Sequence, residues 1–133
     1  MKPINTDAAP TYTIPFNQAM QHGDFIFVSG SVGCPNHDEP IPPAEVGDHI
    51  AGMDVREQTE QTLKNIDAIL NEAGASMDDV VKTTILFADA NDFNDINEVY
   101  RSYMNEPYPA RSAFGVELAA EMDVEIEMIA KAP

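Results

Sequence analysis

Two stretches of the chain repeat apolar residues at helical spacing, and this restricts the fold more than any other feature. In residues 55–73 the apolar side chains fall at i, i+3, i+6 and i+7: Leu63, Ile66, Ile69 and Leu70. Asp54 and Glu57 form a capping-box pattern at its start, and Gly74 is typical of the residue after a helix end. In residues 93–104 the spacings are 3, 4 and 3: Phe93, Ile96, Tyr100 and Tyr103. Both patterns predict amphipathic helices with one buried face.

Five further runs are rich in β-branched and aromatic residues and predict strands. They cover residues 16–22, 25–29, 80–87, 111–117 and 124–131. The resulting order, β-β-α-β-α-β-β, predicts an α+β fold with a mixed sheet and both helices on one face. The length fits a single domain over residues 1–133. Phe25 and Phe27 leave the other sheet face partly apolar, which favours oligomerisation.

Two segments lack this periodicity. Residues 1–13 are polar and contain two prolines, so we expect an arm that packs only weakly. Residues 34–52 contain four prolines (Pro35, Pro40, Pro42 and Pro43), which exclude a central strand or helix there. We expect a surface loop that rims a site.

The charge balance excludes several classes of partner. The chain has 23 acidic and 7 basic residues, a net charge of −16. Nucleic acids and anionic membranes carry the same sign, so we expect neither as a partner. The excess is typical of a solvated acidic shell adapted to high salt. No run reaches 18 apolar residues and the start has no apolar targeting segment, so we expect a soluble, cytoplasmic protein.

Arg111 is the sharpest candidate for a binding residue. It is one of three arginines, it follows a two-proline approach at Pro107 and Pro109, and small or apolar residues surround it. One interpretation is that Arg111 is an ordinary surface arginine in a salt bridge. A desolvated guanidinium, however, needs a planar anion, and its fork fits a carboxylate bidentately. Arg111 is therefore predicted to bind a small carboxylic acid.

Glu125 and Glu127 point to one face of the last strand, and their neighbours point to the other. Both could simply be solvated, or one of them could polarise a water molecule as a general base. Ser29, beside Gly30 at a strand end, is either a strand-terminating hydroxyl or a hydrogen-bond donor to substrate. Alternation alone does not choose between the two glutamates.

Metal and cofactor sites are not expected. His22, His37 and His49 lie in turns or loops without ligand spacing, and we expect them to be exposed. Cys34 is the only cysteine and has no evident histidine partner, so a catalytic thiol is not expected. The run Ser-Gly-Ser-Val-Gly at 29–33 is too short for a phosphate loop, and no helix follows it.

Several segments, in order, resemble the RidA (YjgF) family of reactive-imine deaminases. They include Ile14-Pro-Phe-Asn-Gln-Ala19, Phe27-Val-Ser-Gly30, Asp79-Val-Val-Lys-Thr-Thr84, Asp92-Phe93 to Asn97, Pro109-Ala-Arg-Ser112 and Val124-Glu-Ile-Glu127. Each is weak alone, but six in order over nearly the whole chain make a specific signal. The resemblance implies a chorismate-mutase-like fold (bacillus type) that assembles as a homotrimer with clefts between subunits.

The resemblance also implies roles for individual residues. Arg111 would bind the carboxylate of a 2-imino acid, and Glu125 would activate the attacking water. Ser29 and Asn97 would line the cleft, and the backbone carbonyl of Ala113 would hold the water. The implied reaction is hydrolysis of 2-iminobutanoate- or 2-iminopropanoate-type compounds, such as those from 2-aminoacrylate, to 2-keto acids and ammonia, without metal or organic cofactor.

Two departures from the family pattern bear on this expectation. The family tyrosine is Phe16 here, which removes a hydroxyl near the substrate, and the common cysteine after the arginine is Ala113. The first alternative is a non-catalytic trimer that binds keto acids as a sensor, which a more apolar pocket around Phe16 favours. The second is an endoribonuclease or translation inhibitor, which the net charge of −16 disfavours.

Overall fold

The computed structural model describes all residues, 1–133, and is built on one six-stranded sheet in the order β1-β2-β3-β6-β4-β5. The strands are β1 (Lys2–Ile4), β2 (Ala19–His22), β3 (Phe25–Ser31), β4 (Val80–Phe87), β5 (Ala110–Gly115) and β6 (Val124–Lys131). The α-helices are α1 (Val46–Ile50), α2 (Val55–Glu72) and α3 (Phe93–Tyr103). Four 3-10 turns join them: η1 (Pro43–Glu45), η2 (Met77–Asp79), η3 (Ala90–Asp92) and η4 (Ala119–Glu121).

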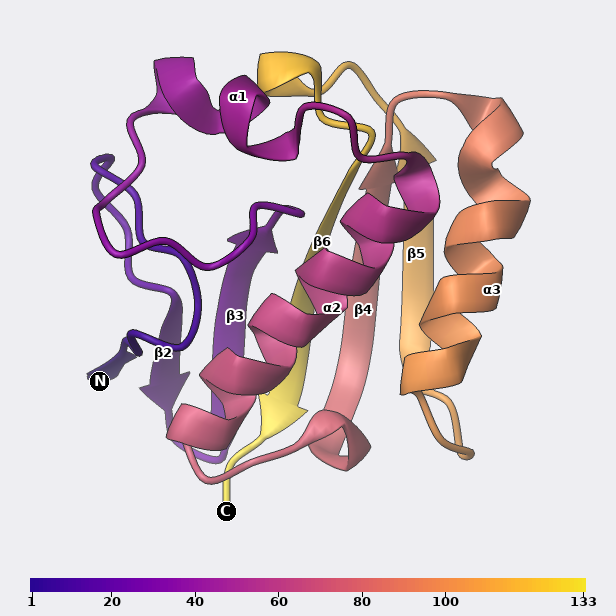
Figure 1. Cartoon of the computed structure of the whole chain (residues 1–133). Coiled ribbons are helices and arrows are strands. Elements are labelled where there is room, and N and C mark those ends of the chain that lie inside the picture. The colour runs from indigo at the N-terminus through magenta and orange to yellow at the C-terminus, as the bar shows by residue number, and fades with distance from the viewer.

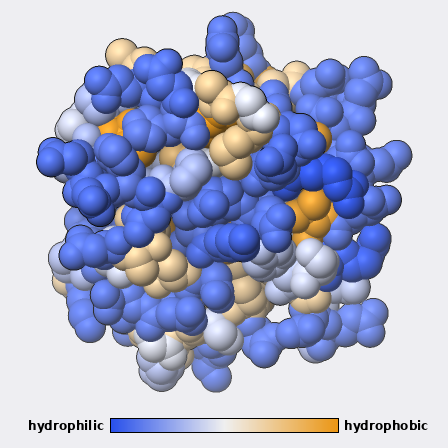
Figure 2. Space-filling model, in the orientation of Figure 1, coloured by the Kyte–Doolittle hydropathy of each residue, from blue (hydrophilic) through white to orange (hydrophobic).

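The sheet is mixed, as predicted. Neighbouring strands run antiparallel except β4 and β5, which are parallel and joined by α3. Helices α2 and α3 lie on the same face of the sheet (Figure 1). The outward surface of this helical layer is predominantly hydrophilic (Figure 2). The expected α+β class and the order of its main elements are confirmed.

Strand β6 shows how the core forms. Val124, Ile126 and Met128 are buried on the helix side, whereas Glu125 and Glu127 point to the other face. The inward residues pack in one cluster with the α2 stripe that the spacing predicted, which includes Leu63. Burial of such side chains stabilises the fold by roughly 1.5–3 kcal/mol each.

The helix signals near α2 are confirmed. The Asp54 side chain accepts a hydrogen bond from the Glu57 amide, and the Glu57 side chain accepts one from the Asp54 amide. This reciprocal cap satisfies two donors that a helix start leaves open. Gly74, with φ of +80°, follows the helix in a left-handed conformation that glycine adopts at no steric cost.

The prediction of a weakly packed N-terminal arm is wrong. Residues 2–4 form an edge strand on β2, and Ile4 and Ala9 are buried. The reason is the buried amide of Gln18, which donates to the carbonyls of Ala9 and Pro10 and accepts from the amide of Thr6. The first predicted strand is correspondingly shorter, because pairing starts only at Ala19.

The segment predicted as an irregular loop contains η1 and α1. The helix begins only after the last proline of the group, and Val46 and Ile50, four residues apart, are both buried. They pack in a small second core: Val32, Cys34, Ile41, Val46, Ile50 and Met122. His22 and His37 are exposed as expected, whereas His49 is half-buried with its ring 4.8 Å from that of His37. No helix combines the length and apolarity required to cross a bilayer.

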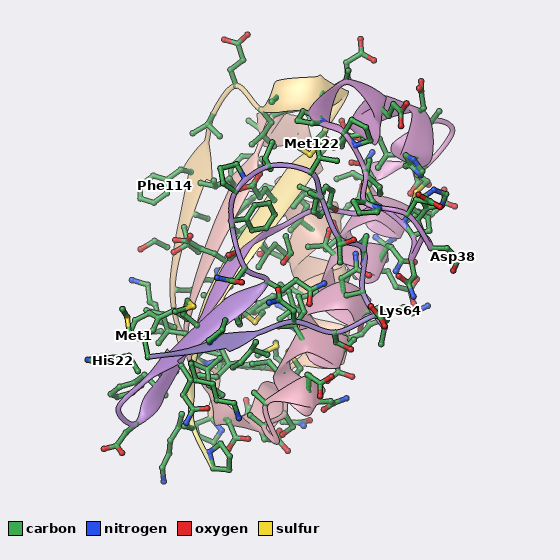
Figure 3. The ribbon with its side chains drawn as sticks, turned by 90° about the vertical axis from the view of Figure 1, so that its left-hand side faces the viewer. Met1, His22, Asp38, Lys64, Phe114 and Met122 are labelled. Atoms are coloured by element: carbon green, nitrogen blue, oxygen red, sulfur yellow. The ribbon has the colours of Figure 1, made fainter.

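The sheet face opposite α2 and α3 carries exposed aromatic side chains. Phe25, Phe27 and Phe114 are 43%, 46% and 53% exposed. Viewed from the side, the Phe114 ring points away from the helices (Figure 3). Glu125 and Glu127 of β6 point to this uncovered face.

Candidate functional site

A cavity of about 1110 Å³ opens where β3 and β6 meet α1 and η4. Its lining comes from five parts of the chain: residues 12–16, residues 29–32, residues 43–48, residues 119–122, and the pair Glu125 and Glu127. The proline-rich segment, which we predicted to be a loop that rims a site, contributes its residues 43–48 to this lining. Met122 lies at this end of the molecule, near the top of Figure 3.

Glu125 is the chemically distinctive group in this cavity. Burial, followed by repulsion from Glu127, raises the pKa of the Glu125 carboxyl above its ordinary value. Glu127 is the more exposed of the two. A partly desolvated carboxylate holds a proton more tightly than a solvated one, which suits a group that must accept and return a proton. The structure thus separates the two glutamates that sequence alternation left equivalent.

Gly30 makes room for the Glu125 carboxylate. A β-carbon at Gly30 would collide with an Oε atom of Glu125. The pairing of β3 with β6 is also irregular between Val28 and Ser31, so the backbone departs from the regular ladder at this point. The absence of a side chain at residue 30 therefore decides where the carboxylate lies.

Ser29 lines the same cavity, but its proton is already engaged. The hydroxyl donates to the backbone carbonyl of Asn17 at 2.6 Å, and the Ser29 amide donates to the carbonyl of Gln18. The lone pairs of the hydroxyl remain free to accept a hydrogen bond. Ser29 is thus arranged as an acceptor in the cavity and not as the donor that the sequence allowed.

Phe16 lines the cavity and stacks on Tyr12, with ring centres 5.8 Å apart. Burial raises the pKa of Tyr12, and the neighbouring Cys34 adds to this effect. The phenol is therefore neutral under ordinary conditions. Sequence reasoning missed Tyr12, whose only signal was an aromatic residue in an otherwise polar arm.

Arg111 lies elsewhere, on the edge strand β5. It pairs with Thr83, and its guanidinium carbon lies 5.3 Å from the ring centre of Tyr100 and 5.7 Å from that of Phe93. The three ion pairs of the chain involve Arg56 and Lys64, so Arg111 has no carboxylate partner despite the net charge of −16. The Arg111 side chain is exposed, so it lacks the desolvation that the sequence predicted.

Asn97 and Ala113 accompany Arg111. Asn97 is four residues after Phe93 and three before Tyr100, so it shares the helical stripe over which Arg111 lies. Its side-chain oxygen is buried and has no hydrogen-bond partner, which is an uncommon and costly state. Ala113 lies two residues after Arg111 on the same strand face, half-buried against the core. We term Arg111, Asn97 and Ala113 together the arginine group. The side-chain oxygen of Asn97 is its acceptor without a hydrogen-bond partner.

The two groups of predicted site residues lie on opposite faces of the sheet. Arg111 is opposite Thr83, which is buried under the helices, whereas Glu125 is opposite Leu86, which alternation puts on the uncovered face. The cavity holds Glu125, Ser29 and Phe16, and the arginine group holds Arg111, Asn97 and Ala113. No three His, Cys, Asp or Glu side chains come together in a geometry that could hold a metal ion.

Comparisons with known proteins cover nearly the whole chain. The family model described as endoribonuclease L-PSP matches residues 6–132. A RutC family protein from Pyrococcus abyssi is 45% identical over 96% of this chain and 94% of its own length. The mouse 2-iminobutanoate/2-iminopropanoate deaminase is 40% identical over 97% of this chain and 90% of its own. The crystal structure of E. coli TdcF with bound serine has a TM-score of 0.84 at 33% identity, covering 100% of both chains.

Proposed function

Because the chain belongs to the endoribonuclease L-PSP family, which includes the RidA proteins, we propose that it hydrolyses 2-imino acids to 2-keto acids and ammonia. The observation that carries this proposal is the unpaired Arg111 of a strongly acidic chain, together with the partly desolvated Glu125. Arg111 is suited to bind a carboxylate, and Glu125 is suited to take a proton from a water molecule. Relatives named as 2-iminobutanoate/2-iminopropanoate deaminases support the same substrate class.

The site becomes complete in a homotrimer. In a closed ring, each subunit presents one surface to the neighbour before it and a different surface to the neighbour after it. The arginine group of one subunit then faces the Glu125 cavity of the next. Burial of Phe25, Phe27 and Phe114 would contribute apolar contact area to such an interface. The same contact would desolvate Arg111, as its sequence surroundings led us to expect.

The reaction follows from these positions. Arg111 binds the carboxylate of the protonated imine through two charge-assisted hydrogen bonds, which orients the electrophilic C2 carbon. Glu125 takes a proton from a water molecule while the water oxygen forms a bond to C2. Glu125 then returns this proton to the nitrogen. As the C–N bond breaks, the new hydroxyl on C2 gives its proton to Glu125 and becomes the keto oxygen, and the departing ammonia finally carries that proton away as ammonium. The free lone pairs of Ser29 can accept a hydrogen bond from the iminium nitrogen.

This hypothesis is tested by the release of keto acid from 2-aminoacrylate generated in situ by a dehydratase. Arg111→Ala should reduce kcat/KM by at least about 10²-fold, because two charge-assisted hydrogen bonds of roughly 1.5–3 kcal/mol each are lost. Arg101→Ala is the matched control, since Arg101 is exposed in the last turn of α3 and also forms no ion pair. Equal turnover in the Arg111 and Arg101 variants would contradict the proposal.

A keto-acid sensor without turnover is the second candidate. The specific observation in its favour is Phe16, whose ring stacks on Tyr12 and offers the cavity no hydroxyl. Keto-acid binding without any hydrolysis of imines by the intact chain would favour this alternative. The ribonuclease activity in the family description remains disfavoured by the net charge of −16, since RNA binding draws on clustered cations.

A further inference from the structure

Aromatic rings, and not an ion pair, lie against the Arg111 guanidinium. Its central carbon is 5.3 Å from the ring centre of Tyr100 and 5.7 Å from that of Phe93, and a ring face attracts a cation over roughly 6 Å. Both rings belong to α3, and we term the pair the aromatic platform. A ring face leaves the N–H groups of the guanidinium available, whereas a carboxylate partner would engage two of them.

The aromatic platform is anchored on β4, the strand beside that of Arg111. The Tyr100 hydroxyl donates a hydrogen bond to Thr83 Oγ1 at 3.0 Å, and Thr83 is the residue that pairs with Arg111 in the sheet. The Phe93 ring lies 5.3 Å, centre to centre, from the ring of Phe87, the last residue of β4. Thr83 and Phe87 are both buried. Each ring of the platform is therefore fixed by a buried side chain of the neighbouring strand.

The two carboxylates of α3 pair with a different cation. Asp95 and Glu98 each accept a hydrogen bond of 2.8 Å from Arg56, which belongs to α2. An ion pair between Arg111 and either carboxylate would have neutralised the guanidinium before a substrate arrived. The helix that supports Arg111 thus gives it two ring faces, while its carboxylates are engaged elsewhere.

From this arrangement we propose that Phe93 and Tyr100 are positioning residues, which hold the Arg111 guanidinium by their ring faces and leave its N–H groups available to a substrate carboxylate. The inference rests on the proposed function, because that function assigns the carboxylate to Arg111. It adds how the guanidinium keeps one orientation without a counter-ion. Since the guanidinium is already held, less conformational freedom is lost when the carboxylate binds.

The test replaces each ring by leucine and measures the hydrolysis of 2-aminoacrylate generated in situ. Phe93→Leu and Tyr100→Leu should each raise KM by about three- to thirtyfold, the range that a cation–π contact is worth, with a smaller change in kcat. Phe93 is only half-buried, so its variant remains informative if Tyr100→Leu does not fold. Tyr100→Phe keeps the ring and should keep KM within about twofold, although it loses the bond to Thr83 and should melt at a lower temperature.

Tyr103→Leu is the matched control. Tyr103 is also half-buried on α3, but its hydroxyl contacts Glu60 and its ring does not lie under Arg111. Its substitution should change KM by less than about twofold. If Phe93→Leu raised KM no more than Tyr103→Leu does, the inference would be overturned and the proposed function would stand.

A double-mutant cycle separates positioning from a general effect on the fold. In the Arg111→Ala background, Phe93→Leu and Tyr100→Leu should each change the residual kcat/KM by less than about twofold, because the rings then have no cation to hold. A further loss as large as that seen with Arg111 present would mean that the rings support the fold and not the guanidinium, which contradicts the inference.

Equilibrium binding covers the case in which no imine is hydrolysed and the proposed function fails. By calorimetry, Phe93→Leu and Tyr100→Leu should bind pyruvate about three- to thirtyfold more weakly than the unaltered chain, whereas Tyr103→Leu should bind it equally well. Equal pyruvate affinities in all of these proteins, or no binding of pyruvate by the unaltered chain, would overturn the inference.

Discussion

The carboxylate of Glu125 occupies the space that a side chain at Gly30 would need. The two residues lie on different strands, β6 and β3, at the point where their pairing is irregular. The position of the candidate base therefore depends on the absence of a side chain on the neighbouring strand.

Gly30→Ala should move the carboxylate aside and reduce kcat/KM for imine hydrolysis by about 10²-fold, the effect expected from misplacing a catalytic group by about 1 Å. The fold should lose only about 1 kcal/mol, because the displaced atoms are the flexible end of a side chain. Gly115→Ala is the control, since a β-carbon there meets nothing closer than 3.6 Å. A Gly30→Ala protein with full activity would show that Glu125 is not positioned in this way.

Glu127→Gln should shift the acid limb of the pH–rate profile to lower pH. Repulsion from Glu127 is the second cause of the raised pKa of Glu125, after burial, and its removal makes the base easier to ionise. The acid limb should remain above the ordinary range of a glutamate in both proteins, because burial persists. An unchanged profile would mean that another group titrates in the acid limb.

Glu125→Gln should reduce kcat/KM by roughly 10²–10⁴-fold while raising the melting temperature at neutral pH. The pKa of Glu125 is raised in the folded protein, so the folded state holds this proton more tightly than the unfolded state. Stability therefore falls as pH rises from the unfolded pKa through the folded pKa. The gain in melting temperature should be present above the folded pKa and vanish below the unfolded one, as calorimetry at several pH values can measure.

Two inactive variants should restore activity when they assemble together. In a trimer with sites between subunits, Arg111→Ala and Glu125→Gln chains that mix at random leave about one site in four with both groups intact. Co-expression followed by purification of mixed trimers measures this recovery. Trimers mixed from Arg111→Ala and Arg101→Ala/Arg111→Ala chains are the matched control and should stay inactive. Failure of the first mixture to recover activity would place both groups in one subunit or outside the reaction.

The melting temperature should rise with salt. Between roughly 0.1 M and 1 M KCl the Debye length falls from about 10 Å to 3 Å, which screens the self-repulsion of a chain with a net charge of −16. Sucrose at matched osmolality controls for solvent exclusion. A melting temperature that falls as KCl rises would rule out salt adaptation as the reason for the acidic surface.

The local periodicity of apolar residues was sufficient to predict the main helices and strands. The stripe of α2, its cap at Asp54 and the alternation of Glu125 with buried neighbours depend on residues a few positions apart, so they could be read directly. The N-terminal strand could not, because it depends on the buried amide of Gln18, more than ten residues away in the chain. Helix α1 depends on contact with η4 and Met122, which lie about seventy residues later in the chain.

The sequence by itself determined helices α2 and α3, strands β2 to β6 and the types of residue in the candidate site. Only the tertiary structure decided that Arg111 and Glu125 lie on opposite faces of the sheet. The physical reason is strand pairing: a side chain's face is set by its register with β4, where Arg111 meets Thr83 and Glu125 meets Leu86. The alternation of Glu125 with buried residues in β6 predicts the face of Glu125. Strand β5 has no such alternation, so only its register with β4 decides the face of Arg111, and a shift of one residue would exchange it.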